Sequence, residues 1–286
     1  MMFRFVVLCL TLMVSAAHAE IHGLETPPDY YFVAFPVATG HTVAGRLSVP
    51  VTEREKKPAV VIVHGSGGVD SRGPAYAQKL NELGIATLEI DMWSARSMSG
   101  GLDRPKHVKN TLPDAKAAFR YLASRPEIDA NRIGLMGFSW GGVVGMLTAS
   151  GQVAGFESVA ALYPVCWGYN EVPGYEFRQV AVKEVLLISG TRDQYDRPDD
   201  CESLVSSLPE PDRERVTEVS LVGATHAFDR AGPPAEFFDP YAFRGKGGEV
   251  RIEHDVTATK RSLYEVGQFF KRTLTQRTLP LNDRDG

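Results

Sequence analysis

The segment IGLMGFSWGGVV, residues 133–144, contains the pattern of a buried strand, a serine between two glycines, and the start of a helix. A serine in the G-x-S-x-G pattern, at a sharp turn from strand to helix, stands above the end of a sheet with its hydroxyl exposed. Gly137 and Gly141 suit this turn because the serine backbone is strained and the strand and helix approach closely. The segment therefore predicts a nucleophile elbow with Ser139 at its tip, and an ordinary structural turn is the alternative.

Short β-branched runs and helical patterns alternate on both sides of this segment. Strands are expected at residues 59–63, 85–90, 132–138, 158–163, 185–189 and 216–222, and helices at residues 75–83, 112–123, 143–149 and 258–274. Strands that alternate with helices form a mostly parallel sheet with helices on both faces. No repeat or linker divides residues 20–274, so the sequence predicts one α/β domain over residues 20–286, with a polar tail from about residue 275.

Three further features are expected around this core. Residues 30–35 and 43–49 predict an antiparallel pair of strands at the edge of the sheet. Thr111 and Asp114 have the spacing of a capping box at the start of a helix. Residues 227–253, with several glycines and prolines, predict a long irregular loop, and such loops in compact domains are usually lids or binding segments.

The composition is that of a globular protein. The chain has 286 residues, of which 43% are hydrophobic and 23% charged, enough for a full core. Its 35 acidic and 31 basic residues give a formal charge of -4, and the basic residues are scattered along the chain. This pattern argues against a nucleic-acid groove and against binding to an anionic membrane surface.

Residues 1–19 have the pattern of a secretory signal peptide. Arg4 precedes an apolar run over residues 5–14, and Ala17-His18-Ala19 has the form of a cleavage site. An uncleaved membrane anchor is the alternative, but it needs about 20 apolar residues, roughly twice the length of this run. The sequence therefore predicts an exported protein, periplasmic or extracellular, with no membrane segment after cleavage.

Two cysteines, Cys166 and Cys201, lie outside the expected signal peptide. An even pair in an oxidising compartment is a candidate disulfide. Two buried free thiols are the alternative.

Partners for Ser139 are expected at the ends of later strands, because a serine hydroxyl needs a base, and the base needs a carboxylate that orients it. Asp193 follows the strand at residues 185–189, and His226 follows the strand at residues 216–222. Both positions lie at the carboxyl end of a parallel sheet, where ligands bind in open α/β folds. The order serine, acid, histidine is that of α/β-hydrolases. The alternatives are, for the acid, Asp196, Asp199 or Asp200 and, for the base, His254.

Acyl transfer also needs donors for the anionic intermediate. The strand at residues 59–63 ends in His-Gly-Ser-Gly-Gly, residues 64–68. By position, the backbone N–H groups of Ser66 and Trp140 are the expected oxyanion donors. A dinucleotide-binding loop is excluded, because Asp70 occupies the position of its third glycine.

These motifs resemble those of the dienelactone hydrolase-like branch of the α/β-hydrolase superfamily. The resemblance rests on four motifs, PAVVIVHG at residues 58–65, GFSWGG at 137–142, GTRD at 190–193 and HAF at 226–228. It implies an α/β-hydrolase fold that hydrolyses an ester or lactone without a cofactor or metal. Ser139 stands where cytosolic members have a cysteine nucleophile, and Gly65 stands where they have a glutamate.

Four residues are expected to bind the substrate. The resemblance implies that Arg96, shortly after the fourth-strand aspartate, binds a substrate carboxylate, and a solvated surface arginine is the alternative. Trp93, Tyr163 and Trp167 are expected near strand ends, where they would wall an aromatic or acyl pocket, and core packing is the alternative.

The sequence thus predicts an exported serine hydrolase that cleaves small-molecule carboxylic esters through an acyl-enzyme. Lactone and amide hydrolysis are alternatives with the same triad, and a catalytically inactive binding protein of the same fold is an alternative of another class. We expect the disulfide between Cys166 and Cys201 to staple two loops of the site and keep Asp193 oriented. The sequence makes no prediction of the oligomeric state.

Overall fold

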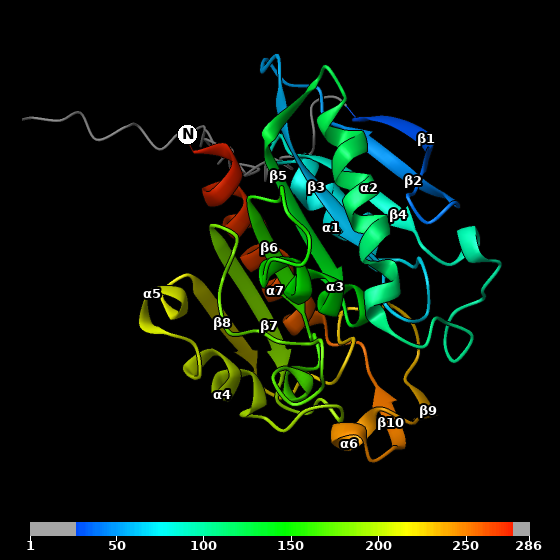
Figure 1. Cartoon of the computed structure of the whole chain (residues 1–286), viewed down its shortest axis with the longest axis vertical. Helices are drawn as coiled ribbons and strands as arrows, with labels where there is room; N and C mark the ends of the chain where they lie inside the picture. Colours follow the sequence, from blue (N-terminus) through cyan, green and yellow to red (C-terminus); the bar gives the residue numbers. More distant parts are fainter. Residues whose placement is uncertain (1–26, 277–286) are drawn as a thin grey trace, which may run out of the picture.

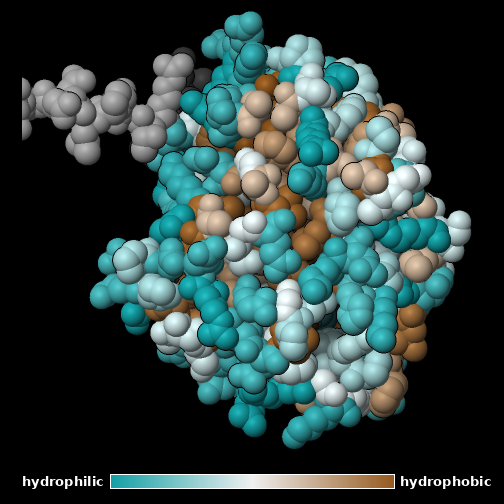
Figure 2. Space-filling model, in the orientation of Figure 1, coloured by the Kyte–Doolittle hydropathy of each residue, from teal (hydrophilic) through white to brown (hydrophobic). Residues whose placement is uncertain are grey.

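A computed structural model of the chain describes residues 27–276. The expected signal peptide, residues 1–19, lies outside the described residues, as does the tail beyond residue 276. Within the described part, no helix has the length and apolar character needed to cross a membrane. On the face shown in Figure 2, hydrophilic residues surround smaller groups of apolar residues.

An eight-stranded sheet in the order β1-β2-β4-β3-β5-β6-β7-β8 forms the centre of the molecule (Figure 1). Its strands are β1 Asp29–Pro36, β2 Thr42–Val49, β3 Lys57–Val63, β4 Ala86–Asp91, β5 Ile128–Phe138, β6 Ser158–Leu162, β7 Glu184–Gly190 and β8 Val216–Leu221. From β4 to β8 every neighbouring pair is parallel, whereas β2 is antiparallel to both β1 and β4. The expected mostly parallel sheet and its antiparallel edge pair are confirmed.

Helices cover both faces of this sheet, as expected. The α-helices are α1 Arg72–Asn81, α2 Leu112–Ala123, α3 Trp140–Ala149, α4 Asp200–Ser206, α5 Glu210–Arg213, α6 Ala242–Gly245 and α7 Val256–Phe270. Short helical turns are η1 Ser94–Arg96, η2 Val108–Thr111, η3 Cys166–Gly168 and η4 Lys271–Thr275. One core cluster packs α2 and α3 against the sheet, and another packs α1 and α7 against its opposite face (Figure 1).

The alternation of side chains along β3 shows why both faces must be covered. Val61 and Val63 belong to the core under α2 and α3, while Val60 and Ile62 belong to the core under α1 and α7. All four side chains are fully buried. Burial of one such side chain contributes about 1.5–3 kcal/mol, so a strand that is apolar on both faces is stable only between two helical layers.

Two expectations about local structure are wrong. The excursion at residues 227–253 is not wholly irregular, because β9 Ala235–Asp239 pairs antiparallel with β10 Gly248–Ile252, with α6 between them. These elements lie beyond the carboxyl ends of the parallel strands (Figure 1). The capping box is also absent, since the Thr111 hydroxyl donates to the Val108 carbonyl and the Asp114 carboxylate pairs with Arg96.

Candidate active site

Ser139 lies at the turn between β5 and α3 with φ +50° and ψ −107°, a left-handed conformation that an L-residue rarely adopts. Its flanking glycines allow this turn. A Cβ on Gly141 would lie 2.1 Å from the carbonyl oxygen of Val63, and one on Gly137 would lie 2.2 Å from the Gly141 backbone. The strained backbone is thus held by a contact between strand and helix in which no larger residue fits.

The structure brings the side chains of Ser139, His226 and Asp193 together. Asp193 follows β7, and His226 lies in the loop after β8. The distance from Ser139 Oγ to His226 Nε2 is 2.8 Å, and that from His226 Nδ1 to Asp193 Oδ2 is 2.7 Å. Because a carboxylate only accepts, Nδ1–H donates to Asp193 and Nε2 is left to accept the serine proton. This arrangement can turn the serine hydroxyl into a nucleophile.

The surroundings of His226 hold its ring in this position. The side chains of His226 and Asp193 are almost fully buried. The second carboxylate oxygen of Asp193 accepts the backbone N–H of Tyr195 at 2.8 Å. The rings of Tyr163 and Tyr195 pack against the imidazole, with centroids 4.9 and 4.3 Å away.

The alternative acids and base have other contacts. Within residues 27–276, no hydrogen bond joins Asp196, Asp199, Asp200 or His254 to Ser139 or His226. Asp196 accepts the backbone N–H groups of Cys166 and Trp167 at 2.7 and 2.8 Å. Burial, together with the nearby negative charge of Asp193, raises the pKa of Asp196 to about 7.

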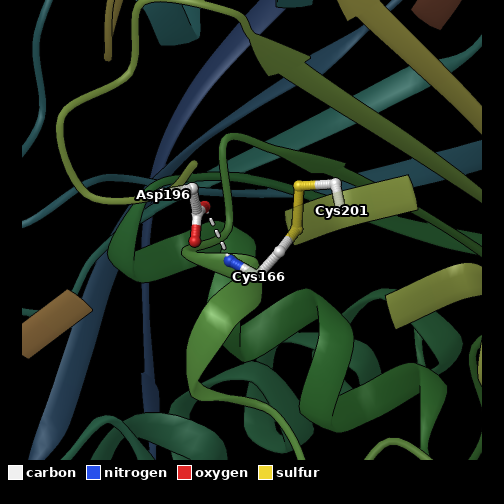
Figure 3. Close-up of side chains that lie close together, drawn as sticks. All are labelled: Cys166, Asp196 and Cys201. Atoms are coloured by element: carbon white, nitrogen blue, oxygen red, sulfur yellow. Dashed lines mark hydrogen bonds between the residues drawn. A yellow bond between two sulfur atoms is a disulfide. The ribbon is translucent and has the colours of Figure 1, made fainter. Parts of the chain in front are cut away.

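Cys166 and Cys201 form a disulfide, as expected (Figure 3). It joins η3 to α4, and Asp196 lies beside it with its carboxylate on the Cys166 N–H. These three side chains are the one group within residues 27–276 close enough to hold a metal ion together. Both sulfur atoms are bonded to each other in the disulfide, so neither is a thiolate that could bind a metal ion.

The loop after β3 contributes Ser66 to the cavity that Ser139 also lines. His64 Nδ1 donates to the Gly65 carbonyl at 2.7 Å, and its Nε2 accepts the Met92 N–H at 3.0 Å. Both bonds are satisfied by the neutral imidazole, and burial lowers the pKa of His64. Because C=O and N–H point in opposite directions across a trans peptide, the Ser66 N–H points away from His64.

Trp140 supplies a second backbone donor. It is the first residue of α3, so its N–H has no carbonyl one turn earlier in the helix. Ser66, Ser139 and Trp140 line one cavity together. An oxyanion hole requires two N–H donors near the nucleophilic hydroxyl, and the N–H groups of Ser66 and Trp140 are the candidates.

This cavity has a volume of about 470 Å³, within the range of small-molecule sites. Six of its eighteen lining residues are aromatic, namely Trp140, Trp167, Tyr169, Tyr175, Tyr195 and Tyr241. Its charged wall residues are Arg104, Lys106 and Asp239, and the imidazole of His107 also lines it. Of the four expected substrate-binding residues, only Trp167 lies among those that line it.

The other three expected substrate residues are placed elsewhere, which corrects the sequence interpretation. Arg96 pairs with the buried Asp114 at 2.6 Å, so it is neither a cavity residue nor a solvated one. Trp93 is buried, and its indole N–H donates to the Ser66 carbonyl at 2.9 Å. Tyr163 is fully buried behind His226. Two of these residues therefore support the site from behind its wall.

Tyr163 belongs to a buried polar network that the sequence did not reveal. Its hydroxyl accepts from Arg72 Nη1 at 3.0 Å and donates to Asp229 Oδ1 at 2.6 Å. Tyr76 donates to the other oxygen of Asp229 at 2.8 Å, and Arg72 also pairs with Asp70. Burial raises the pKa of Asp229. The network joins the loops that carry Ser66 and His226.

Sequence reasoning also missed Arg104, Asp239, Tyr195 and Tyr241 as cavity residues. Asp239 and Tyr241 belong to the excursion at residues 227–253, for which the sequence predicts a lid or binding segment, and they line the cavity. Arg104 lies in a loop with no strand-end signal, and Tyr195 follows Asp193 by two residues without a motif of its own.

The amino-acid sequence is similar to those of a known protein family and of several curated proteins. Residues 43–274 match the model of the dienelactone hydrolase family. The uncharacterized peptidase YtmA of Bacillus subtilis is 31% identical over 108 residues, which are 37% of this chain and 42% of YtmA. The chain spans less than half the length of the curated relatives it matches.

Solved structures share the fold at low sequence identity. A putative dienelactone hydrolase from Klebsiella pneumoniae matches with a TM-score of 0.63 and 15% identity, over 86% of this chain and 99% of that one. Est1E from Butyrivibrio proteoclasticus, with ferulic acid bound, matches with a TM-score of 0.62 and 17% identity, over 85% of this chain and 100% of Est1E. The fold is therefore that of the α/β-hydrolases, as expected from the sequence motifs.

Proposed function

The chain belongs to the dienelactone hydrolase family, and we propose on that basis that it is a serine hydrolase of carboxylic esters with Ser139 as its nucleophile. The observation that carries this proposal is the continuous hydrogen-bonded line from Ser139 Oγ through His226 to Asp193, with distances of 2.8 and 2.7 Å. The positions of Ser66 and Trp140 in the cavity that Ser139 lines support the same chemistry.

In the proposed mechanism, Ser139 Oγ attacks the ester carbonyl as His226 Nε2 takes the serine proton. Asp193 stabilises the imidazolium, and the N–H groups of Ser66 and Trp140 stabilise the oxyanion. The proton then passes from His226 to the leaving alcohol, and an acyl-enzyme remains. A water molecule that loses its proton to His226 attacks the acyl carbon. The bond to Ser139 Oγ then breaks as His226 returns the proton to Oγ, which releases the acid and restores the serine hydroxyl.

Esters of aromatic acids are the substrates that the cavity favours. Its wall contains six aromatic side chains next to Ser139, and flat rings pack well against such walls. The solved structure of Est1E contains an aromatic acid, ferulic acid. A lactone is the second candidate substrate, favoured by the family match, and its hydrolysis would use the same residues.

The test compares Ser139→Ala with Ser206→Ala, which replaces an exposed serine on α4. With the methyl ester of cinnamic acid as substrate, we expect Ser139→Ala to lower kcat by about 1,000-fold or more and Ser206→Ala to leave it unchanged. A fluorophosphonate probe should label the parent protein and not Ser139→Ala. Equal activity in both variants would overturn the proposal.

We also propose that the protein is exported and that its mature form begins at Glu20. The disulfide supports this proposal, because disulfides persist in oxidising compartments. Mass spectrometry of the N-terminal peptide from secreting bacterial cells tests it. A peptide that retains residues 1–19 would contradict cleavage at this position.

A further inference from the structure

Arg104 is a buried cationic cavity residue whose charge the proposed mechanism does not use. Its guanidinium carbon lies 5.5 Å from the ring centroid of Trp140 and 5.5 Å from that of Tyr241, so it is held between two aromatic walls. Only 9% of its side chain is exposed. A charged group this buried is costly unless it is paired.

Asp239 at the end of β9 provides the pairing and fixes the arginine. Its Oδ2 accepts from Arg104 Nη2 at 3.2 Å and from the Tyr195 hydroxyl at 2.9 Å, and its Oδ1 accepts the Tyr241 N–H at 2.8 Å. Both carboxylate oxygens are therefore occupied by protein donors. The position of Arg104 is set by the cavity wall itself.

Arg104 keeps unused donors in this position. A guanidinium has five N–H donors in a planar fork, and within residues 27–276 its one hydrogen bond is to Asp239. The remaining N–H groups belong to a residue that lines the cavity. They can donate to an oxygen of a bound molecule without a change in the ion pair.

The charges around the cavity favour an oxygen-bearing ligand in the same way. Arg104 and Lys106 are cationic, and Asp239 is the only acidic residue that lines the cavity. The wall thus carries a net positive charge, which attracts a carboxylate, and a neutral phenolic or ether oxygen can accept a hydrogen bond from the guanidinium. An aromatic ring bound between the aromatic side chains would lie in the same cavity as the buried, charged donor groups of Arg104.

We propose that Arg104 is a specificity-determining residue, which donates a hydrogen bond to an oxygen carried on the ring of an aromatic acyl group. This inference rests on the proposed ester hydrolysis at Ser139. The preferred substrates are then esters of ring-oxygenated aromatic acids, with a hydroxyl, methoxy or carboxylate substituent. The shared feature of these substituents is the acceptor oxygen.

A matched set of methyl cinnamates tests this specificity. The 4-methyl ester has the size of a substituted ring but no acceptor, and the 4-hydroxy, 4-methoxy and 4-carboxy esters each present an oxygen at the same position. We expect the parent protein to have a kcat/KM about 10-fold or more higher for the oxygenated esters than for the 4-methyl ester. The three oxygenated esters show whether a neutral or an anionic acceptor is preferred.

Variants of Arg104 should remove this preference. Arg104→Lys keeps the cation beside Asp239 but loses the fork, and we expect the oxygenated-to-methyl ratio to fall about 10-fold. A double variant, Arg104→Met with Asp239→Leu, removes both charges and avoids an unpaired buried carboxylate. Arg272→Gln is the control, because this arginine pairs with Glu184 on the surface and should keep the parent ratio.

An equal kcat/KM for the methyl and oxygenated esters in the parent protein would overturn the inference, as would an unchanged ratio in both Arg104 variants. Calorimetric titration of 4-hydroxycinnamate into Ser139→Ala separates this failure from failure of the proposed function. If no ester is cleaved, binding of the acid that weakens about 10-fold with Arg104→Lys still supports the role of Arg104. Binding that is absent, or unaffected by Arg104→Lys, counts against it.

Discussion

Tyr163 shows how one hydroxyl can connect the site to its support. It lies between Arg72 and Asp229, and its ring packs edge-on against the imidazole of His226. Tyr163 is fully buried, so removal of its hydroxyl takes a hydrogen-bond partner from two buried charged groups. Tyr163 is therefore a positioning residue, which acts on the reaction through His226.

We expect Tyr163→Phe to lower the free energy of unfolding by about 1–3 kcal/mol, because Arg72 and Asp229 each lose a buried hydrogen-bond partner. Since the imidazole loses a fixed neighbour but the cavity wall does not change, kcat should fall while KM stays nearly constant. Urea unfolding and ester kinetics provide the two measurements.

The same change at Tyr264, whose side chain is 55% exposed, is the control for loss of a tyrosine hydroxyl. Tyr264→Phe should match the parent in both measurements. A Tyr163→Phe protein as stable and as active as Tyr264→Phe would show that the network does not support the site.

Residue positions were predictable where a motif ties the residue to a strand end. Ser139, Asp193 and His226 each directly follow a strand or lie in the loop after one, and parallel strands bring such positions to one edge of the sheet. Arg96 and Trp93 also follow a strand, yet their side chains turn toward Asp114 and Ser66. The direction of a side chain depends on partners that are distant in sequence, such as Asp114, so no local pattern indicates it.

Among the elements, β4 carries a buried acid that makes the stability depend on pH. Glu89 faces Arg46 across the β2–β4 register, with 3.2 Å between Oε2 and Nη2, and its carboxylate lies against Gly73 at the start of α1. Burial raises the pKa of Glu89 to about 7, against 4.5 for an ordinary glutamate. Between these pH values the folded chain binds more protons than the unfolded chain.

The stability contribution of this protonated carboxyl is therefore fully present below pH 4.5 and is lost as the pH rises through about 7. The glutamine in Glu89→Gln has no proton to lose, so the variant does not share this pH-dependent loss of stability. Its free energy of unfolding, relative to that of the parent, should rise by up to about 3 kcal/mol between pH 4.5 and pH 7. Urea unfolding at four pH values measures the difference. A constant difference would refute the shift, and Glu202→Gln on α4 controls for the loss of one carboxylate.

Elements with a continuous apolar pattern were predictable, because the hydrophobic period reports burial directly. The parallel strands and the helices on both faces follow from such runs. The predicted capping box at Thr111 does not form because its two side chains have other partners. The Thr111 hydroxyl accepts the Trp140 indole N–H at 3.1 Å, and the Asp114 carboxylate forms an ion pair with Arg96. β9 was missed because its sequence AEFFD does not alternate between apolar and polar residues. β10 alternates over only four residues, from Glu249 to Ile252, and in the described part of the chain the two strands pair only with each other.

At the scale of the whole molecule, the Cys166–Cys201 disulfide links η3 to α4. Trp167 of the cavity wall lies in η3. The two cysteines are 35 residues apart. Closing a loop of this length stabilises the fold by up to about 4 kcal/mol, because the unfolded chain loses conformational freedom. The bonds from the Cys166 and Trp167 N–H groups to Asp196 hold η3 independently of the disulfide.

We therefore expect the double variant Cys166→Ala and Cys201→Ala to separate stability from activity. Its Tm should fall by about 8–15 °C relative to the oxidised parent, since 1 kcal/mol corresponds to about 2–4 °C for a domain of this size. At temperatures well below Tm its kcat/KM should stay within about threefold of the parent, because Asp196 still anchors the cavity wall. Dithiothreitol should lower the Tm of the parent toward that of the variant and leave the variant unchanged. A large loss of kcat/KM in a fully folded variant would instead mean that the disulfide itself, by way of η3, keeps Asp193 and the cavity in place.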